Sequence, residues 1–181
     1  MRFHLDPPRA AGPVGLGMPM RAAQEVLRNL DGYRPPAPGA PVHGTLTHYD
    51  TGLSISVGPD GSGRVGAVEI WRPRTGVTVL FREIPVFDLT ADELTDALRR
   101  ITRVEATEDG GLTAPDLLLA FWRSGVPDDP DDEDGRYFES VLVAAPGYYD
   151  TPADRFAAAS GPDGGDPAAG GKGGQPALFE P

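Results

Sequence analysis

The sequence contains no cysteine among its 181 residues. This absence excludes disulfide bonds, thiolate metal sites, iron–sulfur clusters and cysteine nucleophiles. No stretch approaches the ~18 consecutive apolar residues that a membrane-spanning helix needs, and the first residues lack the apolar core of a secretion signal. We therefore expect a cytoplasmic protein that does not contact a membrane.

Positive charge is also scarce. Lys172 is the single lysine, and the fifteen arginines are scattered along the chain, which carries a formal net charge of −11. A protein with this charge repels nucleic-acid phosphates and anionic lipids unless a local basic patch overcomes the overall field. The sequence has no run of basic residues that would form such a patch. We expect neither a nucleic acid nor a membrane as the partner.

Two segments have the apolar spacing of amphipathic helices. The first follows Pro19, a residue favoured in a first helical turn, and ends before Gly32. The second begins at Thr90, with Glu93 at the spacing of a capping box. The predicted buried positions are Ala23, Val26, Leu27 and Leu30 in the first helix and Leu94, Leu98 and Ile101 in the second.

Alternating apolar and polar residues predict a hairpin of strands at 52–57 and 65–71, joined by the turn GPDGSG. Residues 61–66 match GxGxxG, but a dinucleotide fingerprint must open a helix, and a strand is predicted here. The match therefore indicates a turn. Residues 77–81 predict a further strand. Residues 1–5 predict a strand that lies at a sheet edge or frays, because Pro7-Pro8 follows and cannot donate to a ladder.

The most apolar part of the chain lies on both sides of its most acidic part. Residues 115–122 are too continuously apolar for a one-faced strand, which predicts a strand covered on both sides. Residues 138–143 predict its antiparallel neighbour. The fold class is α+β: an antiparallel sheet of about six strands packed by two helices over residues 1–150. A disordered Gly/Pro/Ala-rich tail is predicted over residues 151–181.

The acidic segment between these two strands is the first candidate site. Clustered carboxylates attract hard cations, but the EF-hand register fails, because Pro130 and Val141 would stand where carboxylates are required. A solvated turn that keeps the hairpin soluble is one interpretation, and a contact surface for a basic protein is the other. The predicted binding residues are Asp128, Asp129, Asp131, Asp132, Glu133 and Asp134, with Trp122, Tyr148 and Tyr149 as aromatic neighbours at strand ends.

The histidines give a competing hypothesis. His43 and His48 lie near Asp50, so these three residues, with carboxylates of the acidic segment, are candidates for a metal-dependent hydrolase. Their spacing matches no recognised ligand motif, which favours structural or surface roles. No cofactor or metal site is predicted. In the tail, Ala177-Leu178-Phe179 leaves open a docking peptide, although tails often end in a chance apolar pair.

The stretch GPVGLGMPMRAAQEVL, followed by the hairpin GLSISV and VGAVEIW, resembles the helix-plus-hairpin unit of the SmpA/OmlA and β-lactamase-inhibitor-like domains. The resemblance covers about the first seventy residues and implies a small helix-on-sheet module that binds other proteins. The chain departs from that group because it lacks a lipoprotein cysteine and the second helix of the helical hairpin. The whole chain also resembles an uncharacterised actinobacterial protein family, and this resemblance adds no information about function.

These observations favour a non-enzymatic, acidic protein-binding module. An immunity protein that neutralises a basic toxin would be one instance. Binding requires an exposed acidic surface, whereas the hydrolase hypothesis requires a concave pocket that holds a histidine close to a carboxylate.

Overall fold

The computed structural model describes residues 1–36, 46–126 and 135–148, and Met1–Tyr148 form one compact unit. The α+β class is confirmed, with two α-helices in this part of the chain. The sheet arrangement was predicted wrongly. The strands form one eight-stranded and one five-stranded sheet instead of a single sheet of about six.

The larger sheet is antiparallel throughout. Its strands are β4 (Tyr33–Arg34), β5 (Leu46–Tyr49), β6 (Ser54–Pro59), β7 (Val65–Trp71), β10 (Glu105–Ala106), β11 (Leu112–Ala114), β12 (Leu119–Trp122) and β13 (Ser140–Ala144). They are ordered β10-β11-β12-β13-β7-β6-β5-β4. The predicted hairpin is confirmed as β6 and β7, and GxGxxG lies in and around its turn. The Asp60 carboxylate accepts the backbone N–H groups of Ser62 and Arg64, so this is a structural turn.

The smaller sheet consists of β1 (Arg2–Asp6), β2 (Ala10–Ala11), β3 (Val14–Gly15), β8 (Thr78–Phe81) and β9 (Ile84–Pro85). Its order is β3-β2-β1-β8-β9. The prediction of an edge position for the first strand was wrong, because β1 pairs with β2 on one side and runs parallel to β8 on the other. The prolines do not interrupt this pairing, since Pro7 lies beyond the last residue of the strand.

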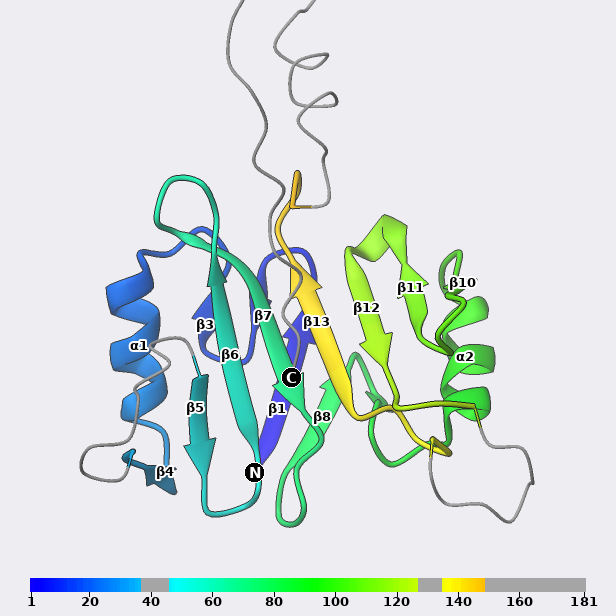
Figure 1. Cartoon of the computed structure of the whole chain (residues 1–181), viewed down its shortest axis with the longest axis horizontal. Helices are drawn as coiled ribbons and strands as arrows, with labels where there is room; N and C mark the ends of the chain where they lie inside the picture. Colours follow the sequence, from blue (N-terminus) through cyan, green and yellow to red (C-terminus); the bar gives the residue numbers. More distant parts are fainter. Residues whose placement is uncertain (37–45, 127–134, 149–181) are drawn as a thin grey trace, which may run out of the picture. The chain divides into compact units, whose positions relative to one another are not determined.

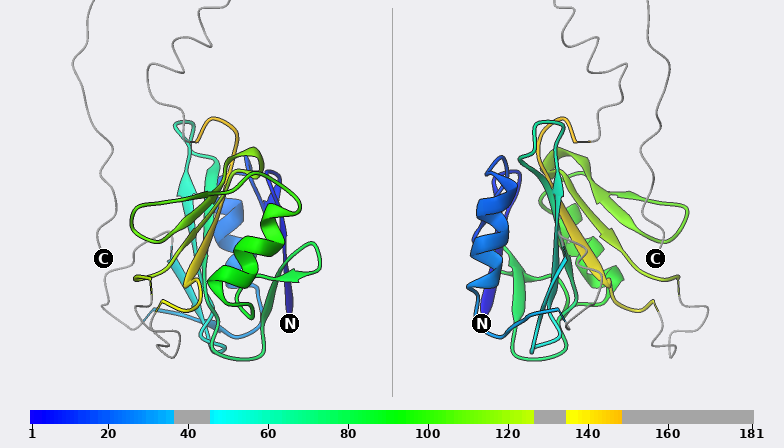
Figure 2. Two further views of the ribbon diagram at one scale, coloured as in Figure 1. Left: turned by 90° about the vertical axis from the view of Figure 1, so that its right-hand side faces the viewer. Right: turned by 60° about the vertical axis from the view of Figure 1, so that its left-hand side comes forward.

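The two helices are α1 (Met20–Arg28) and α2 (Ala91–Arg99). The capping box of α2 is confirmed: Thr90 accepts the backbone N–H of Glu93, and the Glu93 carboxylate accepts that of Thr90. Both helices and the smaller sheet lie on one side of the larger sheet (Figures 1 and 2). Neither α1 nor α2 lies against the opposite face of the larger sheet, which is called the outer face here.

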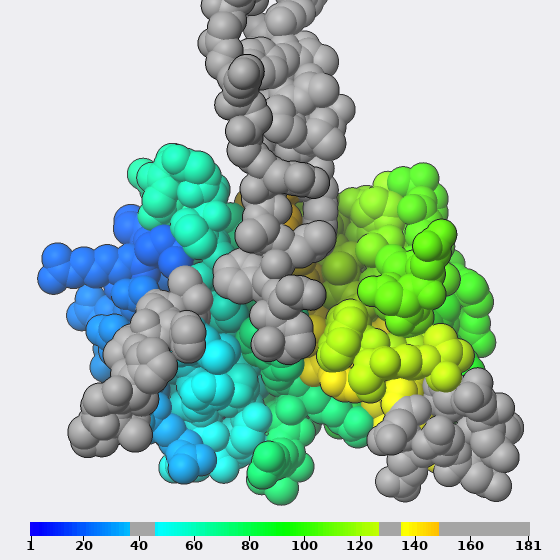
Figure 3. Space-filling model, viewed as in Figure 1, coloured from blue at the N-terminus to red at the C-terminus, as the bar shows by residue number. Residues whose placement is uncertain are grey.

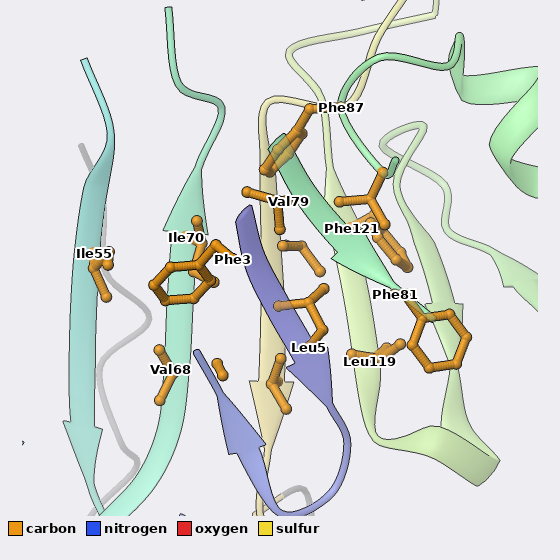
Figure 4. Packing of buried hydrophobic residues seen from close by; sticks show 14 of the residues in the cluster. Phe3, Leu5, Ile55, Val68, Ile70, Val79, Phe81, Phe87, Leu119 and Phe121 are labelled. Carbon is orange, nitrogen blue, oxygen red and sulfur yellow. The ribbon is translucent and has the colours of Figure 1, made fainter. Parts of the chain in front are cut away.

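The core lies between the two sheets (Figure 4). Val68 and Ile70 of the larger sheet face Phe3 and Leu5 of β1, and all four side chains are buried. In the strands of the larger sheet, residues that point into the core therefore alternate with residues that point to the outer face.

The strand predicted at 115–122 is shorter and one-faced. Pro115–Leu117 form a 3₁₀ helix, and Leu118 has a φ of 54° before β12 begins at Leu119. Leu119 and Phe121 are buried, whereas Trp122 is exposed. The prediction of cover on both sides was wrong, because the first half of the apolar run forms a turn. The antiparallel neighbour is confirmed as β13.

Candidate functional site

The register of the larger sheet aligns side chains from distant parts of the sequence on the outer face. Residues paired across neighbouring strands point to the same side of a sheet. One row consists of Arg34, His48, Ser54, Trp71, Ser140 and Trp122. The next row consists of Leu46, Ser56, Glu69, Leu142 and Ala120. The outer face thus combines aromatic, aliphatic and charged groups.

Large apolar side chains remain accessible on this face. Trp122 is 45 % exposed and Leu46 is 37 % exposed. Trp71 and Leu142 are half-buried. Such groups lose contact with water when a second surface covers them, which is the property that enriches tryptophan in protein interfaces.

A carboxylate lies between these apolar groups. The Glu69 side chain is half-buried, and its Oε1 accepts a hydrogen bond of 2.8 Å from the Ser140 hydroxyl. Burial raises the pKa of the Glu69 carboxyl, while the hydrogen bond from Ser140 acts in the opposite direction. Burial also raises the pKa of the Tyr148 hydroxyl, and the nearby charge of Glu69 adds to that effect. Tyr148, which is 41 % exposed, therefore lies close to the outer face.

Two of the predicted binding residues fall on or beside this face, namely Trp122 and Tyr148. The remaining ones lie outside the described residues: Asp128, Asp129, Asp131, Asp132, Glu133, Asp134 and Tyr149. The acidic segment joins β12 to β13, whose ends pair at Trp122 and Ser140.

The residues on either side of the acidic segment are held together. The guanidinium of Arg123 donates to the carbonyls of Gly110 and Gly135, at 2.8 and 3.0 Å. Gly135 has a φ of +71°, and a β-carbon there would lie 2.2 Å from the Gly125 carbonyl oxygen. Only glycine fits this position. Arg123 and Gly135, which flank the acidic segment in the sequence, are therefore held close together.

A pocket of about 230 Å³ opens at the end of the outer face formed by β4, β5 and β6. It is lined by Arg34, His48, Tyr49, Asp50, Gly52, Leu53, Ser54 and Arg74. The β5 and β6 strands lie beside the loop that follows β7 on the same face in the space-filling view (Figure 3). His48 and Asp50, two of the three residues of the hydrolase hypothesis, share this pocket.

The third residue of that hypothesis, His43, lies outside the described residues. Among residues 1–36, 46–126 and 135–148, no three His, Asp or Glu side chains gather in an arrangement that could hold a metal ion. The pocket also contains two guanidinium groups, which repel a cation. Its charge favours an anion.

Several residues of this surface were not predicted from the sequence, notably Glu69, Trp71, Arg34 and Arg74. The register of the larger sheet places the first three on the outer face, and their pairing partners are in most cases far apart in the chain. Alternation within the 65–71 strand does put Glu69 and Trp71 on the polar side of that strand. That signal could have identified these two residues as outer-face positions.

The part of the chain that the structure describes contains no helix long and apolar enough to cross a membrane. Comparison with protein-family models, with curated proteins and with solved structures found no match for this chain.

Proposed function

We propose that this protein is a non-enzymatic binding module that captures a basic protein partner on the outer face of its larger sheet. The observation that carries the proposal is the accessible apolar surface around Trp122, with the half-buried carboxylate of Glu69 at its centre. An apolar surface that contains one partly desolvated charge supports binding of a partner with a matching cationic side chain.

Charge supports the same partner class. The net charge of −11 attracts basic proteins, and the acidic residues at 128–134 follow Trp122 closely in the sequence. Indole rings also bind guanidinium and ammonium groups through cation–π contacts. The predicted partner surface therefore combines arginine or lysine with apolar side chains. An immunity protein that neutralises a basic toxin is one instance of this class.

The test is capture of partners from the native cell by the tagged full-length protein. Changing Asp131, Asp132 and Asp134 to lysine should weaken capture and reduce its sensitivity to salt, because the acidic segment steers association. Trp122→Ala should weaken capture at all salt concentrations, since the indole contributes apolar contact area. Both variants should keep the fold.

The matched control changes three exposed acids on elements away from the outer face, Glu25, Glu83 and Asp88, to lysine. This triple variant makes the same change in net charge. Capture that falls equally in the control would show a general charge effect, and capture that survives Trp122→Ala and the acidic-segment changes would refute the proposed surface.

A further inference from the structure

We infer that the pocket between Arg34, His48 and Arg74 is a binding site for an oxyanion, a phosphate or carboxylate group carried by a ligand. This site is separate from the proposed partner contact around Trp122 and does not depend on it. Two arginines and a histidine line the pocket in a protein whose overall charge is strongly negative. Such a local reversal of sign creates a place where an anion is attracted.

Arg74 is held in place by the backbone below it. Its backbone N–H donates to the Thr51 carbonyl at 2.9 Å, as does that of Thr75 at 3.1 Å. The aliphatic part of Arg74 lies against Gly52, where a β-carbon would come within 2.6 Å of the Arg74 Cγ. Gly52 also has a φ of +77°, which favours glycine. The turn at Gly52 therefore leaves the space that the Arg74 side chain occupies.

The Arg74 charge is not neutralised by the part of the protein described here. Among the described residues, no ion pair or side-chain hydrogen bond engages its guanidinium. A guanidinium offers five N–H donors in a planar arrangement that matches a phosphate or carboxylate. Arg74 is thus the principal ligand-binding group that we assign to the pocket.

Arg34 contributes the second guanidinium. It pairs across the sheet with His48, and its Nε lies 3.6 Å from the Asp50 Oδ1. The side chains of this ion pair are 67 % and 75 % exposed, so the pair is weak. Asp50 offsets one of the two positive charges, and the pocket keeps an excess of positive charge.

His48 supplies an oriented ring. Its Nδ1 lies 2.8 Å from the Ser54 hydroxyl oxygen. When Ser54 donates this hydrogen bond, the ring proton is on Nε2, which becomes a donor for a ligand. Arg34, His48 and Ser54 are neighbours in one row of the outer face, so β4, β5 and β6 together build this wall of the pocket.

The experiment titrates the full-length protein with inorganic phosphate and, separately, with acetate at low ionic strength. Nuclear magnetic resonance follows the His48 ring and the backbone amides of Gly52 and Leu53. We expect saturable shifts of these signals with one or both anions. Stronger binding of phosphate identifies a phosphate-bearing ligand, and stronger binding of acetate identifies a carboxylate-bearing one.

Variants separate a built site from the general effect of charge. Arg74→Gln should weaken binding of the preferred anion about tenfold or more, because a charge-assisted hydrogen-bond pair is lost. Arg34→Gln serves as a second test if Arg74→Gln lowers the melting temperature. Asp50→Asn should strengthen binding. Arg21→Gln, which makes the same charge change on the exposed side of α1, should leave the affinity within about twofold.

Three outcomes would overturn the inference. The first is linear, unsaturated shifts with both anions, which would mean that no site exists. The second is an equal loss of affinity in Arg74→Gln and Arg21→Gln. The third is saturable binding of Zn²⁺ at His48 without any anion binding, which would support the metal-dependent hypothesis instead. Trp122→Ala should weaken partner capture and leave anion binding in the pocket unchanged. Failure of one proposal can therefore be distinguished from failure of the other.

Discussion

Phe121 and Trp122 are consecutive residues of β12 that point to opposite sides of the larger sheet. Phe121 is 3 % exposed, and its ring centroid lies 5.4 Å from that of Phe138. Trp122 is 45 % exposed. Replacing each residue by alanine should therefore separate the cost of opening the core from the cost of trimming the outer face.

The expected magnitudes differ clearly. Phe121→Ala removes a buried ring and should lower the free energy of unfolding by about 3–5 kcal/mol. Trp122→Ala should lower it by at most about 2 kcal/mol, because nearly half of the tryptophan surface is already in contact with water. At about 2–4 °C per kcal/mol for a unit of this size, the first change lowers the melting temperature by roughly 6–20 °C and the second by less than about 8 °C.

Urea unfolding, followed by circular dichroism on both variants and the parent protein, measures the two losses under identical conditions. The decisive quantity is their ratio. Equal losses for Phe121→Ala and Trp122→Ala would mean that the indole is packed as tightly as the core ring. That result would contradict an accessible outer face and remove the main support for the proposed function.

Three further predictions concern single polar groups. Thr90→Ala removes the N-cap of α2 and should cost about 1 kcal/mol in unfolding free energy, measured by urea unfolding; Thr90→Ser should restore most of it. The Glu69→Gln variant should become more stable relative to the parent protein as the pH rises above 4.5, the ordinary pKa of a glutamate. The reason is that burial raises the pKa of Glu69, so the folded parent favours the neutral carboxyl and loses stability as that group ionises. A difference in urea midpoint between variant and parent that does not change with pH would contradict this. Tyr49→Phe removes the buried hydrogen bond of 2.8 Å to the Leu27 carbonyl and should cost about 1 kcal/mol in thermal unfolding; an unchanged melting temperature would contradict this.

Local patterns in the sequence predicted the local elements. The capping box at Thr90, the apolar spacing of both helices and the alternation in the 52–57 and 65–71 hairpin all correspond to elements of the structure. Each of these signals depends on residues that are close in the chain. Helix caps and hairpin turns are decided by such neighbours, so a single sequence is sufficient to identify them.

The sheet arrangement could not be predicted from signals between residues that are close in the chain. The strands β2, β3, β4, β9 and β10 contain two residues each, which is too short to show a period of two. The parallel pairing of β1 with β8 joins residues that have no signal in common along the chain. A sheet of about six strands was therefore predicted where two sheets exist.

The composition of the candidate pocket could not be predicted either, because it depends on strand pairings that the sequence does not show. Asp50 and His48 were recognised because they are close in sequence, whereas Arg34 and Arg74 reach them only through the β4–β5 pairing and the contact at Gly52. Without the arginines, the sequence left a metal-dependent hydrolase only as the alternative hypothesis for these residues. The positive charge of the arginines favours an anion over a metal ion in this pocket, since guanidinium groups attract anions.

The parallel pairing of β1 with β8 also limits how early the protein can fold during its synthesis on the ribosome. Arg2 pairs with Thr78, so β1 has no partner on that side until the ribosome has added the intervening residues. At roughly 5–20 residues per second, this delay lasts about 4–15 s. During that interval the apolar side chains of Phe3 and Leu5 lack this neighbouring strand, and a chaperone that binds apolar segments of nascent chains would have a binding site there.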